Sequence, residues 1–364
     1  MKHSMLATVS LLALTQMAMA DGGTVNVYAW GGYISPATTE AFKAATGTTV
    51  NVVEFAGVED PETRLLTGDS GFDLVVTAGF TVPRLIGAGA IAPLDKSALP
   101  NIGNIDPEFI ESKLSLLDPG LEYTVPVNMG FTTIAINADK VKELLGEDAP
   151  LDTLDLLFNA ETLAKLSGCG VSYLDSGLEV IGLALLATDV EYQFKPTDEE
   201  LARAEALLKG AVPHVRYFDN LRYVQDLASG DLCMAMVWNN DVVRATKMAA
   251  DAGKPQNLQI LYPKEGALLW SDHYVIPVDA PNPDGGKAFL NFLMEGQWAA
   301  EITNNFSMAA PNTKSVEFVT PEYREDPMIW PPTDWLATLK VNDTFTQETV
   351  SKVMRAYTVA RTGG

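Results

Sequence analysis

"TVNVYAWGGYISPATTEAFKAATGTTVNVVEF", from Thr24 to Phe55, predicts a strand, a helix and a second strand in close succession. Residues 24–29 alternate between polar and apolar, as in a half-buried strand. Ser35 is a suitable cap for a helix that begins at Pro36, and Gly47 is a suitable end for it. Two strands joined by a helix are typical of a parallel sheet with helices packed on its faces.

The same alternation of strands and helices continues along the chain. "FDLVVTAG" (Phe72 to Gly79) is almost continuously apolar, which indicates a strand buried on both faces. The sequence therefore predicts an α/β fold with mostly parallel sheets flanked by helices. The other expected elements are helices at 61–68 and 81–94, a strand at 131–137, a helix-rich stretch at 138–209, a strand at 231–240, a helix at 241–253, two strands around a turn at 258–278, and helices at 285–303 and 335–361.

The first twenty residues have the pattern of a cleaved signal peptide. Lys2 precedes a short apolar stretch, and Ala18-Met19-Ala20 is a small-residue cleavage motif. We expect cleavage after Ala20 and export. The 344 residues that remain exceed the size at which a single core usually keeps growing, so two domains are expected.

Charge and cysteine content narrow the possible ligands. The chain has 25 basic and 47 acidic residues, a formal net charge of −22, so we expect no nucleic-acid partner. An acidic surface suits a cationic ligand. Two cysteines, Cys169 and Cys233, favour one disulfide in an exported protein, and they lack the spacing of metal ligands. With only three histidines, we expect neither a metal nor a cofactor.

Aromatic residues stand where several predicted strands end. Trp30, Trp238 and Trp270 occupy such positions, and acids follow the last two at Asp241 and Asp272. In open α/β sheets, ligands bind outside the carboxyl ends of the strands. Aromatic rings and carboxylates together bind ammonium groups, so a crevice for a cationic amine is predicted.

Long segments of the chain resemble the periplasmic solute-binding proteins of polyamine ABC importers, the putrescine- and spermidine-binding family. The segments that carry the resemblance are "VYAWGGYISPATTEAFKAATG", "GFDLVVT", "LIGAGAIAPLDKSALPNIGNID", "LSGCGVSYLDSGLEV", "GDLCMAMVWNNDV", "YPKEGALLWSDHYVIP", "KAFLNFLM" and "WPP".

The resemblance implies two lobes that close on a ligand about a hinge. The N-terminal lobe would comprise residues 21–136 and 272–315, and the C-terminal lobe residues 137–271 and 316–364. It implies a monomer that delivers a small cationic amine to a membrane permease, and it also implies the disulfide between Cys169 and Cys233. The implied ligand-binding residues are Trp30, Gly31, Gly32, Tyr33, Ala78, Phe80, Glu179, Trp238, Asp241, Trp270, Asp272 and Met308.

The chain departs from the family pattern at three places. Gly31 and Gly32 stand where relatives usually carry a polar residue and a carboxylate, Ala78 replaces a serine, and Met308 replaces an aromatic residue. One acid of the implied site is therefore missing. The ligand can be a diamine, or another amine such as a monoamine, an agmatine-like compound or a zwitterion.

Two other functional classes were considered. "GDSGF" (Gly68 to Phe72) is similar to a serine-protease nucleophile segment, but its last glycine is absent and no histidine motif accompanies it, so we predict no enzyme. His273 follows Asp272, and neighbouring strand residues point to opposite faces, so we expect His273 to face away from the ligand. A receptor that signals to a membrane sensor would use the same fold and stays an alternative.

Overall fold

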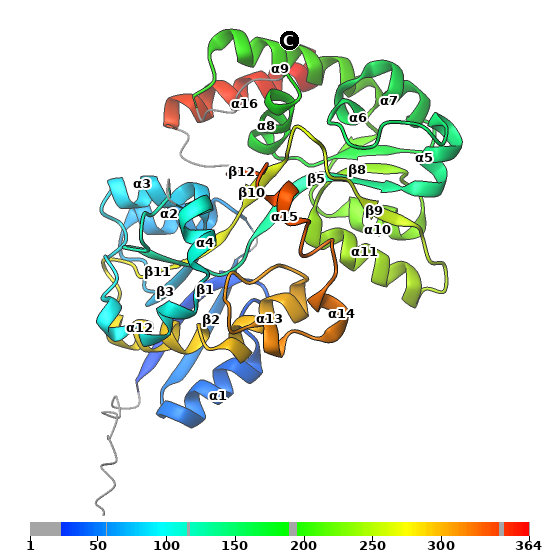
Figure 1. The fold of residues 1–364 in the computed structure, drawn as a ribbon. Helices are drawn as coiled ribbons and strands as arrows, with labels where there is room; N and C mark the ends of the chain where they lie inside the picture. The colour runs from blue at the N-terminus through cyan, green and yellow to red at the C-terminus, as the bar shows by residue number, and fades with distance from the viewer. Residues whose placement is uncertain (1–22, 56, 115–116, 189–194, 342–345, 364) are drawn as a thin grey trace, which may run out of the picture.

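The computed structural model describes residues 23–55, 57–114, 117–188, 195–341 and 346–363. The expected signal peptide and its cleavage site lie outside these residues. The described chain forms two sheets, each flanked by helices, in two parts of the molecule (Figure 1). This arrangement confirms the predicted α/β class, but the sheets are mixed and not mostly parallel, because β11 in the first sheet and β5 in the second run antiparallel to their neighbours.

The first sheet has five strands in the order β2-β1-β3-β11-β4. β1 pairs in parallel with β2 and β3, as predicted, and β11 runs antiparallel between β3 and β4. All five residues of β3 are buried, in agreement with its apolar sequence. The strands are β1 (Thr24–Trp30), β2 (Thr49–Phe55), β3 (Leu74–Ala78), β4 (Thr124–Pro126) and β11 (Asp272–Val275).

The second sheet has seven strands, with the path β12-β10-β5-β8-β6-β7 and β9 beside β5. Its central strand β5 is buried along its whole length and runs antiparallel to β8, β9 and β10. The strands are β5 (Gly130–Asn137), β6 (Val171–Tyr173), β7 (Tyr217–Phe218), β8 (Met234–Trp238), β9 (Leu258–Ile260), β10 (Leu268–Trp270) and β12 (Lys340–Val341).

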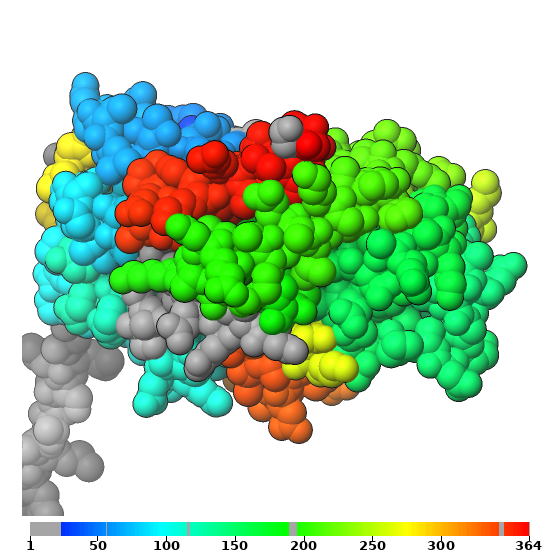
Figure 2. Space-filling model, turned by 90° about the horizontal axis from the view of Figure 1, so that it is seen from above, coloured from blue at the N-terminus to red at the C-terminus, as the bar shows by residue number. Residues whose placement is uncertain are grey.

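Helices cover both sheets. In Figure 1, α1 and α12 lie beside the first sheet, and α10 and α11 lie beside the second. The carboxyl-terminal helix α16 packs on α8 and α9, and Figure 2 shows it (red) next to green segments of the second part. The helices are α1 (Pro36–Thr46), α2 (Asp60–Thr67), α3 (Val82–Gly87), α4 (Pro107–Phe109), α5 (Ala138–Leu145), α6 (Asp155–Phe158), α7 (Ala160–Leu166), α8 (Gly177–Leu186), α9 (Asp198–Ala211), α10 (Arg222–Ser229), α11 (Asn239–Asp251), α12 (Pro283–Leu293), α13 (Gly296–Phe306), α14 (Pro321–Arg324), α15 (Thr333–Leu336) and α16 (Gln347–Thr362).

The opening strand, helix and strand form as their sequence predicts. The Ser35 side chain accepts a hydrogen bond from the backbone N–H of Thr38 at 3.1 Å and so caps α1. Pro36 is the first helical residue. A backbone N–H at this position would have no intrahelical acceptor, so proline loses no hydrogen bond there. Gly47 ends the helix with a φ of 76°, a left-handed conformation that glycine adopts without a steric penalty.

The chain passes between the two sheets at short segments. Residues 127–129 connect β4 to β5, and Ser271 alone separates β10 from β11. The two crossings are hydrogen bonded to each other, because the N–H of Val127 donates to the carbonyl of Asp272 at 2.7 Å. Met129 also pairs with Ala309 in a β-bridge, which brings a third segment to the same place.

Three details differ from the sequence prediction. β5 belongs to the second sheet, whereas the lobe boundary that the resemblance implies groups residues 130–136 with the strands of the first. The stretch 258–278 forms three strands instead of two, because Ser271 interrupts its second half, so that β10 joins the second sheet and β11 joins the first. The predicted helix at 335–361 is divided into α15, β12 and α16, since Lys340 and Val341 extend the second sheet beside β10.

A disulfide joins Cys169 to Cys233, as predicted, with Cα atoms 5.6 Å apart and a sequence separation of 64. It links the starts of the parallel strands β6 and β8, where Val171 pairs with Met234. In the part of the chain that the structure describes, no helix is both long enough and apolar enough to cross a bilayer.

Candidate functional site

Four side chains meet where the chain crosses between the sheets. The Tyr33 hydroxyl donates to Oδ2 of Asp272 at 2.7 Å, and the Asn128 amide donates to the same oxygen at 3.0 Å. The Asn128 amide lies 3.0 Å from the Tyr33 hydroxyl, and both groups contact the sulfur of Met308, at 3.3 and 3.4 Å. Tyr33, Asp272 and Met308, three predicted site residues, are thus brought together.

The carboxylate of Asp272 is buried, with 7 % of the residue exposed. Burial raises its pKa above the ordinary value, and hydrogen bonds from Asn128, Tyr33 and Trp30 oppose the rise. Among the described residues, no basic side chain forms an ion pair with it. A buried carboxylate without a cation is stabilised when an ammonium group approaches.

The turn after β1 places aromatic rings beside this carboxylate. The Trp30 indole packs on Phe55 with ring centroids 4.5 Å apart, and it is one of the groups that lower the pKa of Asp272. Gly32 has a φ of 78°, and a Cβ added there would lie 3.2 Å from the Phe306 ring. The second glycine is therefore required by both backbone conformation and packing.

His273 has partners different from those of Asp272. Its two ring nitrogens lie 3.0 Å from the Thr124 hydroxyl and 2.8 Å from the Ser271 hydroxyl. Burial lowers the pKa of His273 to about 3, so the ring is neutral near pH 7. His273 and Asp272 thus have separate hydrogen-bond partners, as expected for neighbouring strand residues that point to opposite faces.

A second cluster lies in the second sheet. Oε1 of Glu179 accepts hydrogen bonds from the Trp238 indole N–H at 2.9 Å and from the Thr132 hydroxyl. Glu179 is in the first turn of α8, where the helix dipole favours a carboxylate. Trp238 is the last residue of β8 and Thr132 is its partner on β5. Two predicted site residues therefore meet here.

Asp241 has partners that the sequence analysis did not foresee. Its Oδ2 accepts a hydrogen bond from the Tyr223 hydroxyl, and its Oδ1 lies 3.2 Å from Nη2 of Arg244. Burial raises the pKa of Asp241, while Arg244 and the Tyr223 hydrogen bond lower it. Asp241, which was predicted to bind an ammonium group, is thus already paired with the Arg244 cation. This pairing reduces the stabilisation that a bound ammonium group would add.

The Trp270 ring covers the backbone at Gly130. A Cβ added at Gly130 would lie within 2.2 Å of this ring, so only glycine fits beneath it. The Trp270 indole N–H is buried and has no hydrogen-bond partner among the described residues, and neither has Oδ1 of Asn240. Unpartnered buried polar atoms are destabilising, and they occur at sites that take ligands or water.

Ala78 and Phe80 lie at the end of β3. Ala78 pairs with Asp272 across β3 and β11, so this small side chain lies next to the Asp272 cluster. The Phe80 ring lies farther along the chain and faces the guanidinium of Arg84, whose carbon is 5.8 Å from the ring centroid. Ala78 is therefore brought to the cluster, while the observed contact of Phe80 is with Arg84.

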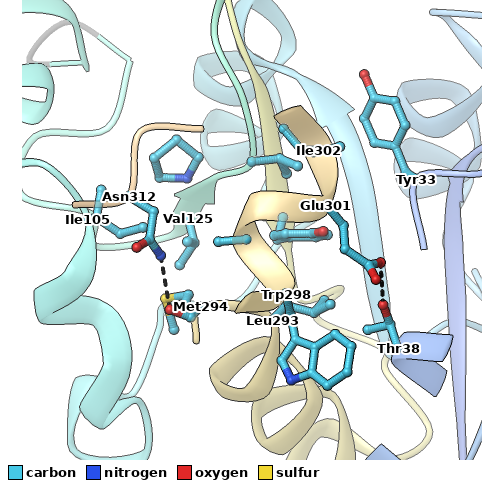
Figure 3. A pocket seen from close by; sticks show the side chains of 14 residues that line it. Tyr33, Thr38, Ile105, Val125, Leu293, Met294, Trp298, Glu301, Ile302 and Asn312 are labelled. Atoms are coloured by element: carbon cyan, nitrogen blue, oxygen red, sulfur yellow. Dashed lines mark hydrogen bonds between the residues drawn. The ribbon is translucent and has the colours of Figure 1, made fainter. Parts of the chain in front are cut away.

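A small cavity lies behind Tyr33 inside the first part of the molecule (Figure 3). Its volume of about 20 Å³ corresponds to a single water molecule, so it does not hold an organic amine. Thr38 donates a hydrogen bond to Glu301 at 2.7 Å on its wall, and the Tyr33 hydroxyl points away from this pair (Figure 3). Tyr33 thus lines the cavity and also takes part in the Asp272 cluster through its hydroxyl.

Several residues around these clusters were not predicted. Asn128 lies in the crossing segment and Thr132 lies in β5. Polar residues within buried stretches give only a weak sign of function in the sequence. Arg244 follows Asp241 by three positions on a predicted helix, and this spacing is a known signal for an ion pair. Across the part of the chain that the structure describes, no group of His, Cys, Asp and Glu could hold a metal ion.

The chain is similar to known proteins over most of its length. The chain is 38% identical over 327 residues to the putrescine-binding periplasmic protein PotF of Escherichia coli, with 89% of this chain and 88% of that protein covered. It is 34% identical to a putrescine/agmatine-binding protein of Pseudomonas aeruginosa, with 92% and 91% covered.

Solved structures show the same architecture. A protein named as a candidate spermidine/putrescine ABC transporter of Listeria monocytogenes matches with a TM-score of 0.77 and 27% identity, covering 94% of this chain and 99% of that one. The structure of a GABA receptor, Atu4243, matches with a TM-score of 0.70 at 18% identity, which shows the fold alone. A family model for bacterial extracellular solute-binding proteins matches residues 37–331. The chain therefore belongs to the bacterial extracellular solute-binding protein family.

Proposed function

We propose that this protein is the ligand-binding component of an ABC importer and that it binds a cationic amine, with putrescine as the first candidate. The observation that carries the proposal is the Asp272 carboxylate, which is buried beside Trp30 and Tyr33 and has no ion-pair partner among the described residues. The protein works in the periplasm after cleavage behind Ala20, as a monomer, and delivers the amine to a membrane permease. The paired cysteines suit that oxidising compartment.

The binding energies of these groups are sufficient for a transport protein. A hydrogen bond between a carboxylate and an ammonium contributes about 1.5 to 3 kcal/mol. An indole face beside the ammonium adds about 0.5 to 2 kcal/mol. Two carboxylates with aromatic neighbours, such as Asp272 with Trp30 and Glu179 with Trp238, together contribute about 4 to 10 kcal/mol before ordering costs, a range that includes the roughly 8 kcal/mol of micromolar affinity.

The mechanism we propose is closure of the two parts about their crossing segments. Trp270 ends a strand of one sheet and Asp272 begins a strand of the other, so Ser271 is a pivot inside the site. An amine held by Asp272 in the first part and by Glu179 in the second stabilises the closed form, which the permease recognises.

Isothermal titration calorimetry of the mature protein tests the proposal directly. We expect putrescine to bind with micromolar affinity or better. We expect the affinities of spermidine, agmatine and butylamine to follow how well the length of each ligand fits the site. GABA serves as the zwitterionic comparison and glucose as the neutral one. Binding of glucose or of a dicarboxylate, without binding of any amine, would show that the proposed ligand class is wrong.

Replacing Arg244 by Gln should strengthen amine binding. The change leaves Asp241 without its cationic partner, and an ammonium group can then take that place. We expect putrescine affinity to rise about threefold to tenfold, which titration calorimetry measures. Lys247→Gln, on the same helix and paired with Asp251 at 4.0 Å, removes the same charge as a control. Weaker binding in Arg244→Gln would mean that the guanidinium itself contacts the ligand, which then carries an anionic group.

A further inference from the structure

The carboxyl-terminal helix α16 holds the loop that leads into α8 (Figure 1). Asp175 lies in this loop, between β6 and α8. Its Oδ1 accepts hydrogen bonds from the Tyr357 hydroxyl at 2.7 Å and from Nη1 of Arg361 at 2.6 Å. The same Nη1 donates to the Tyr357 hydroxyl at 2.9 Å. Asp175, Tyr357 and Arg361, here called the α16 clamp, therefore form one network across 182 and 186 positions of the chain.

Aromatic rings fix the geometry of the α16 clamp. The guanidinium carbon of Arg361 lies 4.3 Å from the centroid of the Phe218 ring and 5.2 Å from that of Tyr357. Burial raises the pKa of Tyr357, and its hydrogen bond to Asp175 adds to the rise, so the hydroxyl stays protonated and donates. A lone exposed ion pair contributes little, but a guanidinium stacked on rings and shared between two oxygens is held in one orientation.

The same helix packs directly on the first residue of α8. This residue is Gly177, and a Cβ added there would lie 2.7 Å from the sulfur of Met354 and 2.9 Å from Cδ1 of Tyr357. Contacts this short exclude a side chain, so the α16 surface lies against the backbone of α8. Tyr357 thus fixes the start of α8 twice, through its ring at Gly177 and through its hydroxyl at Asp175.

Glu179 connects the α16 clamp to the amine site. It lies two residues after Gly177, in the first turn of α8, and it is buried. This turn closes when the N–H of Val180 donates to the carbonyl of Ser176 at 2.9 Å. The Ser176 side chain makes no capping hydrogen bond, although serine commonly caps a helix in this way. The start of α8 therefore depends on contacts from distant segments, which α16 supplies.

We propose that Tyr357 and Arg361 are positioning residues for the amine site, because they hold the start of α8 and so keep the Glu179 carboxylate in place to bind an ammonium group. This inference rests on the proposed function, in which Glu179 holds the amine in the second part of the molecule. It gives α16 a role in recognition, although none of the residues predicted to contact the ligand belongs to that helix.

The first test compares Arg361→Gln with Arg355→Gln by titration calorimetry with putrescine. Arg355 is exposed on the same helix and forms no ion pair with a described residue, so it is the matched control. Two hydrogen bonds between Asp175 and Asn220, at 2.8 and 3.2 Å, keep the loop folded when the guanidinium is lost. We expect Arg361→Gln to weaken putrescine binding about fivefold and Arg355→Gln to leave it unchanged.

A double-mutant cycle with Glu179→Gln separates positioning from a general loss of stability. If Arg361 acts through Glu179, its replacement should weaken binding less than about 1.5-fold further once the carboxylate is gone. An undiminished fivefold loss in the Glu179→Gln background would overturn the positioning role. Wild-type affinity in Arg361→Gln alone would overturn it as well.

The indole N–H of Trp238 reports on Glu179 without any ligand, because it donates to Oε1 of that residue at 2.9 Å. In ¹⁵N-labelled protein we expect its resonance, assigned by its loss in Trp238→Phe, to shift in Arg361→Gln and to stay unchanged in Arg355→Gln. An unchanged resonance in Arg361→Gln would overturn the link between α16 and Glu179.

These readouts distinguish the inference from the proposed function. If wild-type protein binds putrescine while Arg361→Gln changes neither the affinity nor the Trp238 resonance, the α16 clamp has no positioning role and the proposed function stands. If wild-type protein binds no amine while the resonance shifts in Arg361→Gln, the proposed function is wrong and the link from α16 to Glu179 is supported.

Discussion

Replacing Asp272 by Asn is expected to weaken putrescine binding about 100-fold, equivalent to roughly 2.7 kcal/mol. The substitution keeps the size of the side chain and most of its contacts with Tyr33 and Asn128, but it removes the negative charge. An ammonium group next to the resulting amide would be buried without a counter-ion, which is strongly unfavourable. Titration calorimetry of the variant, with circular dichroism to verify folding, measures the effect.

The pH dependence provides an independent readout for the same residue. Burial raises the pKa of Asp272 in the free protein, and a bound ammonium favours the ionised form. Putrescine affinity should therefore fall as the pH decreases through this raised pKa, and Asp272→Asn should not show that dependence. Asp284→Asn, a highly exposed aspartate at the start of α12, is the matched control and should bind like wild type. An affinity loss below threefold in Asp272→Asn would contradict the assigned role.

Local signals in the sequence were enough to predict the strand, helix and strand at the amino terminus. Ser35, Pro36 and Gly47 act within a few residues of their own position, so the ends of α1 follow from local chemistry. The change of sheet at Ser271 could not be predicted in this way. Trp270 and Asp272 continue one extended segment, and only pairing with distant strands decides that they belong to different sheets.

The site shows the same division between local and distant information. Trp30, Trp238 and Asp272 were identified because strand ends in α/β sheets converge on ligands. Asn128 was missed because its importance comes from a contact with Asp272 across 144 positions in the chain. Gly31 and Gly32 indicated a missing acid, and the N–H of Gly32 donates to the Glu54 carboxylate on the neighbouring strand β2, a contact that the local sequence does not predict.

Removing the disulfide should produce the largest loss of stability. The bond closes a loop of 64 residues, and loops of that length correspond to about 4 kcal/mol in the chain-entropy model. Both cysteines precede strands of the second sheet, so the loss of stability should affect that part of the molecule. We expect the double variant Cys169→Ala/Cys233→Ala to melt about 10 °C lower in that part's transition, measured by differential scanning calorimetry.

Reduction of the wild-type protein is the control, because it breaks the bond without changing the side chains. It should lower the same transition by a similar amount, and a shift of less than 2 °C in both experiments would contradict the prediction. Putrescine affinity of the folded variant should stay within about twofold of wild type. Cys233 lies before the start of β8, whereas Trp238 ends the strand, so the bond and the amine site are at opposite ends of the same element. The disulfide therefore stabilises the strand that carries Trp238 without taking part in recognition of the ligand.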